Sequence, residues 1–346
     1  MKKKTKEKPK SKKKKPLTKG RLVARIVSVT LLLLVVACCA IGDWYVHQPR
    51  EWQESHRAFY TAPLCYFGDR TAFITDAFGW TGHDAVYDPD DETAPSNTVL
   101  FAGAPVRVGD PAPDDIQVLN HREFMIGWSP SLRHPVWAAY HVVRDARFDA
   151  LKRPNFKEDP SVASSPAAKD YARSGYDRGH LVPNRAIVTR YGPDEQEKTF
   201  LMTNIAPQRP ALNRGPWREM EQRISDLWTA RYGEIWVIVG AVSPTGSRTK
   251  LENTTIDVPQ QYYMLIAAQD KEGVRALAVL LPQTAAVNDF PVHNIVTIKE
   301  LETATGLEFF PDMPKFLARP LKTDRPTRLW PIRWHDIVKL ILLRFT

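Results

Sequence analysis

The sequence predicts an α+β fold with a mixed sheet and flanking helices, set behind a basic and apolar N-terminal region. Apolar, β-branched runs over 134–144 and 233–243 have the length and composition of core strands. Between them, residues 216–232 carry large apolar side chains at helical spacing. With 346 residues, of which 43% are hydrophobic, the chain has enough apolar material for a sizeable core.

The positive charge is concentrated at the two ends of the chain. Residues 1–25 carry a net charge of +12 and residues 316–346 carry +5, so residues 26–315 carry −8 of the total of +9. The basic composition is therefore no sign of a nucleic-acid-binding face on the folded domain. A polyanion bound by the domain must be held by local cations or by a metal ion.

The N-terminal region reads as a tail followed by a membrane segment. Residues 1–25 are low-complexity and basic, which predicts disorder near anionic lipid. Residues 26–42 contain no charge, and Trp44 and Tyr45 follow where interfacial aromatic residues belong. Three interpretations stay open: an uncleaved signal anchor, a lipoprotein signal with Cys38 as the lipidated residue, and an ordinary cleaved signal peptide. In all three the N-terminus is inside and the domain lies outside the cytoplasmic membrane, in the periplasm or the extracellular space.

The remainder divides into a linker, one domain and a tail. We expect a juxtamembrane linker over 43–95, a folded domain over 96–315 and a basic, amphipathic tail over 316–346. The end of that tail, 330–346, suits either packing on the domain or lying on the membrane surface. The three cysteines, Cys38, Cys39 and Cys65, imply neither a disulfide framework nor a zinc site.

Within the domain, strands are expected over 134–144 and 233–243, and a hairpin over 261–270 and 274–282. The helix between them has Pro216 in its first turn and Gly233 after its end. A second, short helix is expected over 298–307. The long helix is predicted to bury one stripe: Trp217, Met220, Ile224, Leu227 and Trp228.

Candidate chemistry begins at Asp177-Arg178-Gly179-His180. The glycine permits close backbone approach, the histidine is available as a general base near neutral pH, and the arginine offers a fork suited to phosphate. The same four residues are also compatible with a salt-bridged surface turn that happens to hold a histidine. The sequence around the long helix bears on that choice.

Asn213 and Glu221 are eight residues apart near the start of that helix. Their directions then differ by about 80° and their axial positions by about 12 Å, so both can face one side without binding one small ion directly. One carbonyl oxygen plus waters, with an acid behind the waters, suits Mg²⁺. The alternative is a helix N-cap and a solvated acid.

These residues belong to ordered motifs that resemble the DNA/RNA non-specific endonuclease family, the ββα-metal nucleases. The family's D-R-G-H signature stands at 177–180, and its T-F-x-x-(S/T)-N-x-x-P-Q-x-x-x-L-N-x-x-x-W-x-x-x-E run stands at 199–221. The likeness covers roughly residues 97–312. It implies a mostly antiparallel central sheet with flanking helices and a ββα-metal active-site motif.

The resemblance also implies roles for individual residues. Asn213 would be the direct ligand of one hydrated Mg²⁺, for which Mn²⁺ is a substitute, and Glu221 and Asp177 would hold that ion's waters. The catalytic residues would be His180 as general base, Asn204 positioning the histidine or the waters, Arg178 against metal and phosphate, and Arg153 stabilising the charged phosphate, with Glu221 counted among them.

The implied activity is membrane-anchored hydrolysis of DNA and RNA through their backbone phosphates, leaving 5′-phosphates. Oligomeric state stays open, with a dimer as one option. Arg185 departs from the small residue common at its position in the family. Two alternatives remain: a membrane-tethered nucleic-acid-binding module without turnover, motivated by the acidic domain and Arg185, and a metal phosphodiesterase for a small substrate.

Overall fold

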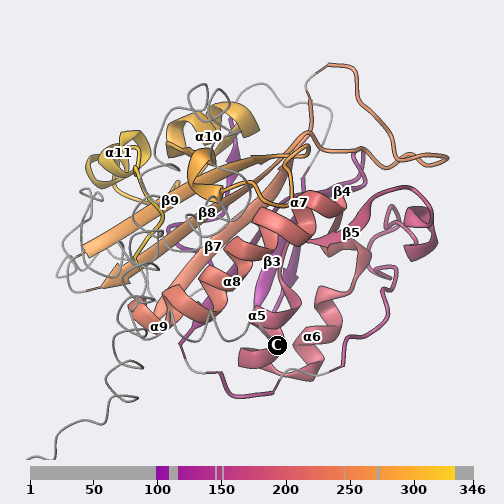
Figure 1. Cartoon of the computed structure of the whole chain (residues 1–346), viewed down its shortest axis with the longest axis horizontal. Helices are drawn as coiled ribbons and strands as arrows, with labels where there is room; N and C mark the ends of the chain where they lie inside the picture. The colour runs from indigo at the N-terminus through magenta and orange to yellow at the C-terminus, as the bar shows by residue number, and fades with distance from the viewer. Residues whose placement is uncertain are drawn as a thin grey trace, which may run out of the picture. The chain divides into compact units, whose positions relative to one another are not determined.

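The computed structural model describes residues 99–108, 116–144, 146–149, 152–244, 246–270 and 273–331 (Figure 1). The expected tail over 1–25, the apolar segment over 26–42, the linker over 43–95 and residues 332–346 lie outside these ranges. Across the described ranges, no helix combines the length and the apolar character needed to cross a membrane.

A seven-stranded sheet, counted over the described residues, forms the centre of the domain, and each pair of neighbouring strands is antiparallel. This confirms the α+β class and the mostly antiparallel sheet, whereas the expected mixed character is absent because no two neighbouring strands of this described sheet are parallel. In spatial order its strands are β10 (Ile295–Val296), β9 (Gly273–Pro282), β8 (Gln261–Asp270), β7 (Glu234–Val242), β4 (His134–Val143), β3 (Phe124–Ser129) and β2 (Gln117–His121). Two small antiparallel sheets pair β1 (Val106–Arg107) with β11 (Leu307–Glu308), and β5 (Asp177–His180) with β6 (Ile205–Gln208).

The expected strands are confirmed, and their unbroken apolar composition has a structural cause. In β4, Ala138 and Tyr140 join one hydrophobic core, whereas Trp137 and Ala139 join a second core. Successive side chains of a strand point to opposite faces, so a strand buried on both faces must be apolar throughout.

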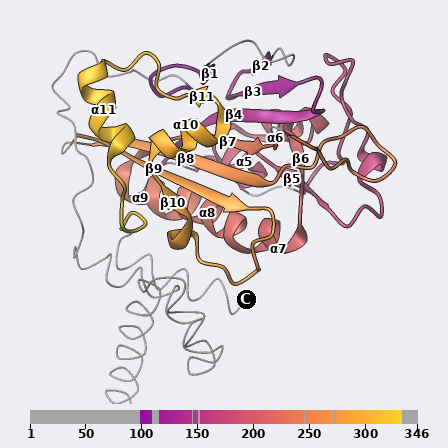
Figure 2. The same ribbon diagram turned by 90° about the horizontal axis from the view of Figure 1, so that it is seen from above.

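Helices cover both faces of this sheet (Figure 2): α5, α8 and α9 lie on one side, and α10 and α11 on the other. The α-helices are α5 (Asn184–Tyr191), α6 (Pro193–Thr199), α7 (Pro210–Leu212), α8 (Arg218–Gln222), α9 (Thr229–Tyr232), α10 (Ile298–Thr305) and α11 (Lys315–Thr323). Short 3₁₀ turns are η1 (Ala168–Tyr171), η2 (Met202–Asn204) and η5 (Pro291–Asn294), and two π-helical segments are η3 (Asn213–Trp217) and η4 (Arg223–Trp228).

The chain from Pro210 to Tyr232 is helical through α7, η3, α8, η4 and α9, with a kink at Gly215, and the predicted apolar stripe is buried. Gly215 leaves the helical region at φ −104° and ψ −115°, so the helix that carries the stripe begins at Pro216, as predicted. The sequence did not predict the short helical segment from Pro210 that precedes the kink. A Cβ on Gly215 would lie 2.6 Å from the carbonyl oxygen of Val287, so glycine also lets that loop reach the helix.

The ordered core continues beyond residue 315, where the sequence placed the end of the domain. Leu321 of α11 is buried in the core on the α10 side. Further on, Trp330 is fully buried against Trp228, whose indole Nε1 donates to the carbonyl oxygen of Trp330 at 2.9 Å. The start of the segment 330–346 therefore packs on the domain.

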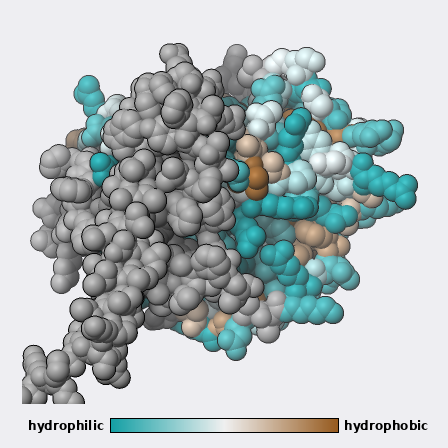
Figure 3. Space-filling model, in the orientation of Figure 1, coloured by the Kyte–Doolittle hydropathy of each residue, from teal (hydrophilic) through white to brown (hydrophobic). Residues whose placement is uncertain are grey.

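The visible part of the described surface is mainly hydrophilic, with brown atoms in small scattered groups (Figure 3). Large apolar side chains exposed among the described residues are Val106, Val108, Val118, Phe148, Val287 and Phe316.

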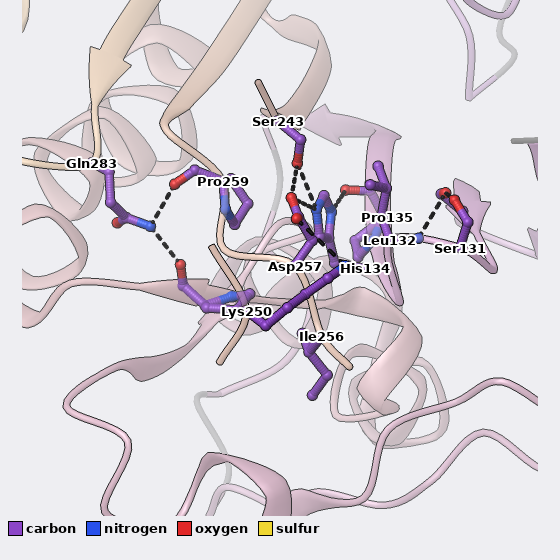
Figure 4. A network of polar contacts seen from close by, with 12 residues as sticks. Ser131, Leu132, His134, Pro135, Ser243, Lys250, Ile256, Asp257, Pro259 and Gln283 are labelled. Carbon is purple, nitrogen blue, oxygen red and sulfur yellow. Dashed lines mark hydrogen bonds and ion pairs between the residues drawn. The ribbon is translucent and has the colours of Figure 1, made fainter. Parts of the chain in front are cut away.

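A largely buried polar network lies where β4 begins and β7 ends (Figure 4). Ser243 Oγ donates to Asp257 at 2.5 Å and lies 3.1 Å from His134 Nε2, while His134 Nδ1 lies 2.9 Å from the carbonyl oxygen of Pro135. The side chains of His134 and Asp257 are fully buried. Burial acts to raise the pKa of Asp257, but hydrogen bonds from His134 and Ser243 and the nearby Lys250 hold it below its usual range. The network connects residues 246–258, which lie between β7 and β8 in the sequence, to the start of β4.

Candidate active site

The candidate site is built on the antiparallel β5–β6 pair and the long helix that follows it. The connection between the two strands contains α5 and α6, and we call the pair the β5–β6 hairpin. The register pairs Asp177 with Gln208 and His180 with Ile205. Tyr262 Oη and Gln283 Nε2 both donate to the carbonyl oxygen of Pro207, at 2.6 and 2.8 Å. The end of β6, and hence the start of the helix, is therefore fastened to the central sheet.

Gly179 is required by its neighbour across the hairpin. A Cβ at this position would lie 2.1 Å from Oε1 and 2.4 Å from Cδ of Gln208, whose side chain is fully buried. The Gln208 side chain thus occupies the space that any other residue at position 179 would need. The glycine between Arg178 and His180 keeps the two strands of the hairpin close together.

The His180 ring packs on two phenylalanines, with centroids 5.4 Å from Phe156 and 4.8 Å from Phe200, and these two rings also contact each other at 5.1 Å. Its Nε2 is buried and has no hydrogen-bond partner among the described residues. Burial, and then the positive charge of Arg153, lower the pKa of His180 to about 3. The imidazole is therefore neutral at physiological pH, as a general base must be.

Asn204 fastens the chain directly after the histidine. Its Oδ1 accepts the backbone N–H of Val182 at 2.9 Å, and its Nδ2 donates to the carbonyl oxygens of Val182 and Thr199. The side chain is fully buried, so every one of these bonds is protected from water. Asn204 acts on the position of the segment that carries His180.

Asp177 is held by two neighbours on the long helix. Asn213 donates from Nδ2 to Asp177 Oδ2 at 2.9 Å. Arg214 donates from Nε to Oδ2 at 2.9 Å and from Nη2 to Oδ1 at 2.7 Å. Although partial burial acts in the opposite direction, the bonds from Arg214 and Asn213 keep the pKa of Asp177 below its usual range, so the group is a carboxylate.

Glu221 lies in α8, partly buried, and accepts a hydrogen bond from Trp217 Nε1 at 3.1 Å. Desolvation raises the pKa of Glu221 to about 7, although the Trp217 bond and the charges of Arg153 and Arg218 act in the opposite direction. The positive charge of Arg153, an exposed residue, lowers the pKa of both His180 and Glu221.

Arg178 is turned toward a loop. Its Nε and Nη2 both donate to the carbonyl oxygen of Ala168, at 3.1 and 2.9 Å, and its guanidinium lies 5.2 Å from the Phe156 ring centroid. Arg178 thus contacts Ala168 and Phe156, and Phe156 also packs on His180. The expected role of Arg178 at metal and phosphate stays a prediction.

Residues 102–316, more than half of the chain, match the DNA/RNA non-specific endonuclease family. The chain belongs to this family. It is 29% identical over 244 residues to the mitochondrial nuclease EXOG of Xenopus laevis, a match that covers 66% of this chain and 64% of that protein. It is 27% identical over 214 residues to mitochondrial endonuclease G of Homo sapiens, covering 57% of this chain and 70% of that protein.

A solved structure of the EndoG/EndoGI complex resembles the fold at a TM-score of 0.53 and 25% identity, covering 60% of this chain and 90% of that one. A nuclease of Nostoc is 26% identical over 211 residues, covering 57% of this chain and 74% of that protein. The chain therefore spans less than two thirds of the frog nuclease and about three quarters of the cyanobacterial one.

In this non-specific endonuclease domain, the donor set fits a hydrated hard cation. A carboxylate can only accept hydrogen bonds, so the Asn213 amide must turn its NH₂ to Asp177 and its Oδ1 away from it. Oδ1 is then free to act as a ligand. The described residues contain no cluster of three His, Cys, Asp or Glu that would bind a metal directly. One amide oxygen with carboxylates behind waters is a set that Mg²⁺ accepts.

Sequence reasoning missed two arginines of this endonuclease domain, Arg214 and Arg218. Arg214 binds Asp177, and Arg218 lies close enough to Glu221 to lower its pKa. Arg214 follows Asn213 directly in the sequence, and Arg218 lies three residues before Glu221, which was the available signal. Their neighbours in space, however, depend on how the helix meets the β5–β6 hairpin.

Proposed function

We propose that this chain is a Mg²⁺-dependent endonuclease that hydrolyses phosphodiester bonds of DNA and RNA without reading the sugar or the base. The observation that carries the proposal is the Asn213 amide, turned by Asp177 so that its carbonyl oxygen is free, on the same hairpin-and-helix unit as the neutral His180. A base and a hard-cation site in this unit are what phosphodiester hydrolysis requires.

His180 takes the proton of the attacking water, because its ring is neutral and Nε2 has no competing donor or acceptor among the described residues. Phe156, Phe200 and Asn204 hold the ring and its backbone in place. Arg153, exposed and near both His180 and Glu221, offsets the negative charge that develops on the phosphoryl oxygens.

Asn213 Oδ1 would hold Mg²⁺, for which Mn²⁺ is a substitute, with Glu221 and Asp177 binding its waters. When bound, the ion supplies positive charge for the phosphoryl oxygens and assists departure of the 3′ oxygen, which leaves a 5′-phosphate. Since these contacts address phosphate rather than base edges, both DNA and RNA are substrates.

We also propose that residues 26–42 anchor the enzyme in the cytoplasmic membrane with the catalytic domain outside, in the periplasm or the extracellular space. The support is the uncharged run behind a basic tail. Membrane fractionation with protease digestion of intact cells tests this, and mass spectrometry of the N-terminus distinguishes an uncleaved anchor from a lipidated Cys38 or a cleaved signal. Digestion only after cell lysis would contradict the external placement.

The nuclease proposal is tested with the full chain in detergent, incubated with closed circular plasmid and with a structured RNA, in Mg²⁺ and in EDTA. We expect Mg²⁺-dependent nicking and loss of both substrates, absent in His180→Ala and in Asn213→Ala. Treatment of the products with a 5′-phosphate-specific exonuclease checks the position of the cut. Tight binding without cleavage by the wild type would overturn the proposal in favour of a binding module.

A further inference from the structure

Arg214 is an exposed side chain held in a fixed geometry. Its side chain is 67% exposed, whereas Asp177 is 19% exposed. Surface ion pairs contribute little to stability, so the pair is not explained by the needs of folding. A bidentate bond to a partly buried carboxylate nevertheless fixes the plane of the guanidinium.

Arg214 binds Asp177 through one edge of its guanidinium, and this choice of edge decides which of its N–H donors remain available to a ligand. An arginine has five N–H donors, and here Nε and one Nη2 hydrogen are bound to Asp177. The remaining donors, on Nη1 and Nη2, find no acceptor among the described residues. These form the end of the fork, which can bind two oxygens of one phosphate side by side.

The location of that free edge follows from Asp177, which binds Asn213 and Arg214 through the same oxygen, Oδ2. The Asp177 carboxylate therefore joins Arg214 to Asn213, the proposed metal ligand. Because Asp177 neutralises its charge, Arg214 repels a cation at Asn213 less than a lone arginine would.

A second exposed arginine extends this positive surface along the helix. Arg218 is four residues further on, exposed, and close enough to Glu221 to lower its pKa. Residues 99–315 hold 25 Lys/Arg and 26 Asp/Glu, a net charge of −1, so the domain as a whole offers little attraction to a polyanion and local arginines must supply it.

Resting on the proposed function, we propose that Arg214 binds a backbone phosphate adjacent to the scissile one, held by Asp177 for that purpose. The site then takes a polynucleotide, with at least two phosphates, in preference to a small molecule with a single phosphodiester. Arg214 is a binding and specificity-determining residue and takes no part in the proton transfers.

The test compares Arg214→Gln with wild type on a single-stranded oligonucleotide and on bis(p-nitrophenyl) phosphate, which has one phosphate. We expect kcat/KM for the oligonucleotide to fall about 10-fold or more, and at least five-fold further than for the single-phosphate ester. Arg214→Lys, which keeps the charge and loses the fork, should fall between. Arg319→Gln removes an equally exposed arginine from α11, on the other face of the sheet, and should match the wild type.

A binding measurement makes the inference independent of turnover. In EDTA, Arg214→Gln should bind the oligonucleotide more weakly, with the slope of log K against log salt reduced by about 1, whereas Arg319→Gln should not. Equal losses on both substrates, or unchanged binding and salt slope, would overturn the inference. Absence of turnover in the wild type would instead count against the nuclease proposal and leave the binding result to decide on Arg214.

Discussion

Asn213 donates its side-chain Nδ2 to Oδ2 of Asp177 at 2.9 Å, and this one bond decides which way the Asn213 amide faces. Arg214 and Asn213 together keep Asp177 ionised, so the carboxylate has no proton to offer the amide oxygen. The candidate metal ligand is thus oriented by the protein before any cation arrives.

Asp177→Asn should weaken divalent-metal binding about 10-fold, because an amide at position 177 both donates and accepts and no longer dictates the orientation of Asn213. Mn²⁺ titration followed by electron paramagnetic resonance measures this without any need for turnover. Asp194→Asn, at an exposed position in α6, is the matched control and should leave the affinity unchanged. Unaltered Mn²⁺ binding in Asp177→Asn would show that Asp177 does not orient the ligand.

The His180 imidazole should not titrate between pH 5 and pH 8 in the metal-free protein, because its pKa is lowered to about 3. Imidazole proton resonances, assigned by comparison with His180→Gln, report this directly. Arg153→Gln removes a positive charge that disfavours protonation and should move the midpoint upward. A wild-type midpoint near the ordinary value for histidine would contradict the burial that the structure shows.

Glu221→Gln should stabilise the metal-free protein at pH 8 while it abolishes cleavage. The folded-state pKa of Glu221 is raised to about 7 from 4.5, so the folded state favours the protonated form. The stabilisation that the protonated Glu221 side chain gives to the folded state is full below the unfolded-state pKa and is lost as the pH rises through the folded-state pKa. We therefore expect a gain in unfolding free energy of about 1–3 kcal/mol at pH 8.

The same comparison of Glu221→Gln with wild type at pH 4.5 is the internal control. Glu221 is protonated in the folded state at this pH, so little cost of burying its charge remains and the gain in unfolding free energy should largely disappear. Urea unfolding at the two pH values, in EDTA, measures the difference. A gain of equal size at both pH values would mean that the substitution acts through packing or the Trp217 bond instead of through charge.

Gly179→Ala should destabilise the hairpin by about 1–3 kcal/mol, because the new methyl group overlaps the buried Gln208 side chain. Gln208→Ala removes the three atoms nearest to that methyl group. The double variant should therefore recover much of the loss relative to the sum of the single variants, which a double-mutant cycle in urea quantifies. Additive losses would show that the two residues do not compete for one space.

The strands were predictable because β4, β7, β8 and β9 are buried on both faces and so appear in the sequence as unbroken apolar runs. The helical segment before the kink was not, since the kink places Gly215 against Val287, more than seventy residues further along the chain. The candidate site residues were proposed from their motifs, and their roles stay predictions. The pairing of Arg214 with Asp177 was not found, because strand and helix are joined only by tertiary packing.

Asn213 lies just before the kink at Gly215, and Glu221 lies on the helix that follows it. Loss of one residue between Gly215 and Glu221 would turn everything beyond it by about 100° and shift it by about 1.5 Å. Glu221 would then change its direction relative to Asn213, and the buried stripe that follows would turn away from the sheet. Among relatives of this chain, the interval between these two positions should therefore vary by substitution alone, while length changes gather in the loops, where the count of residues sets no angle.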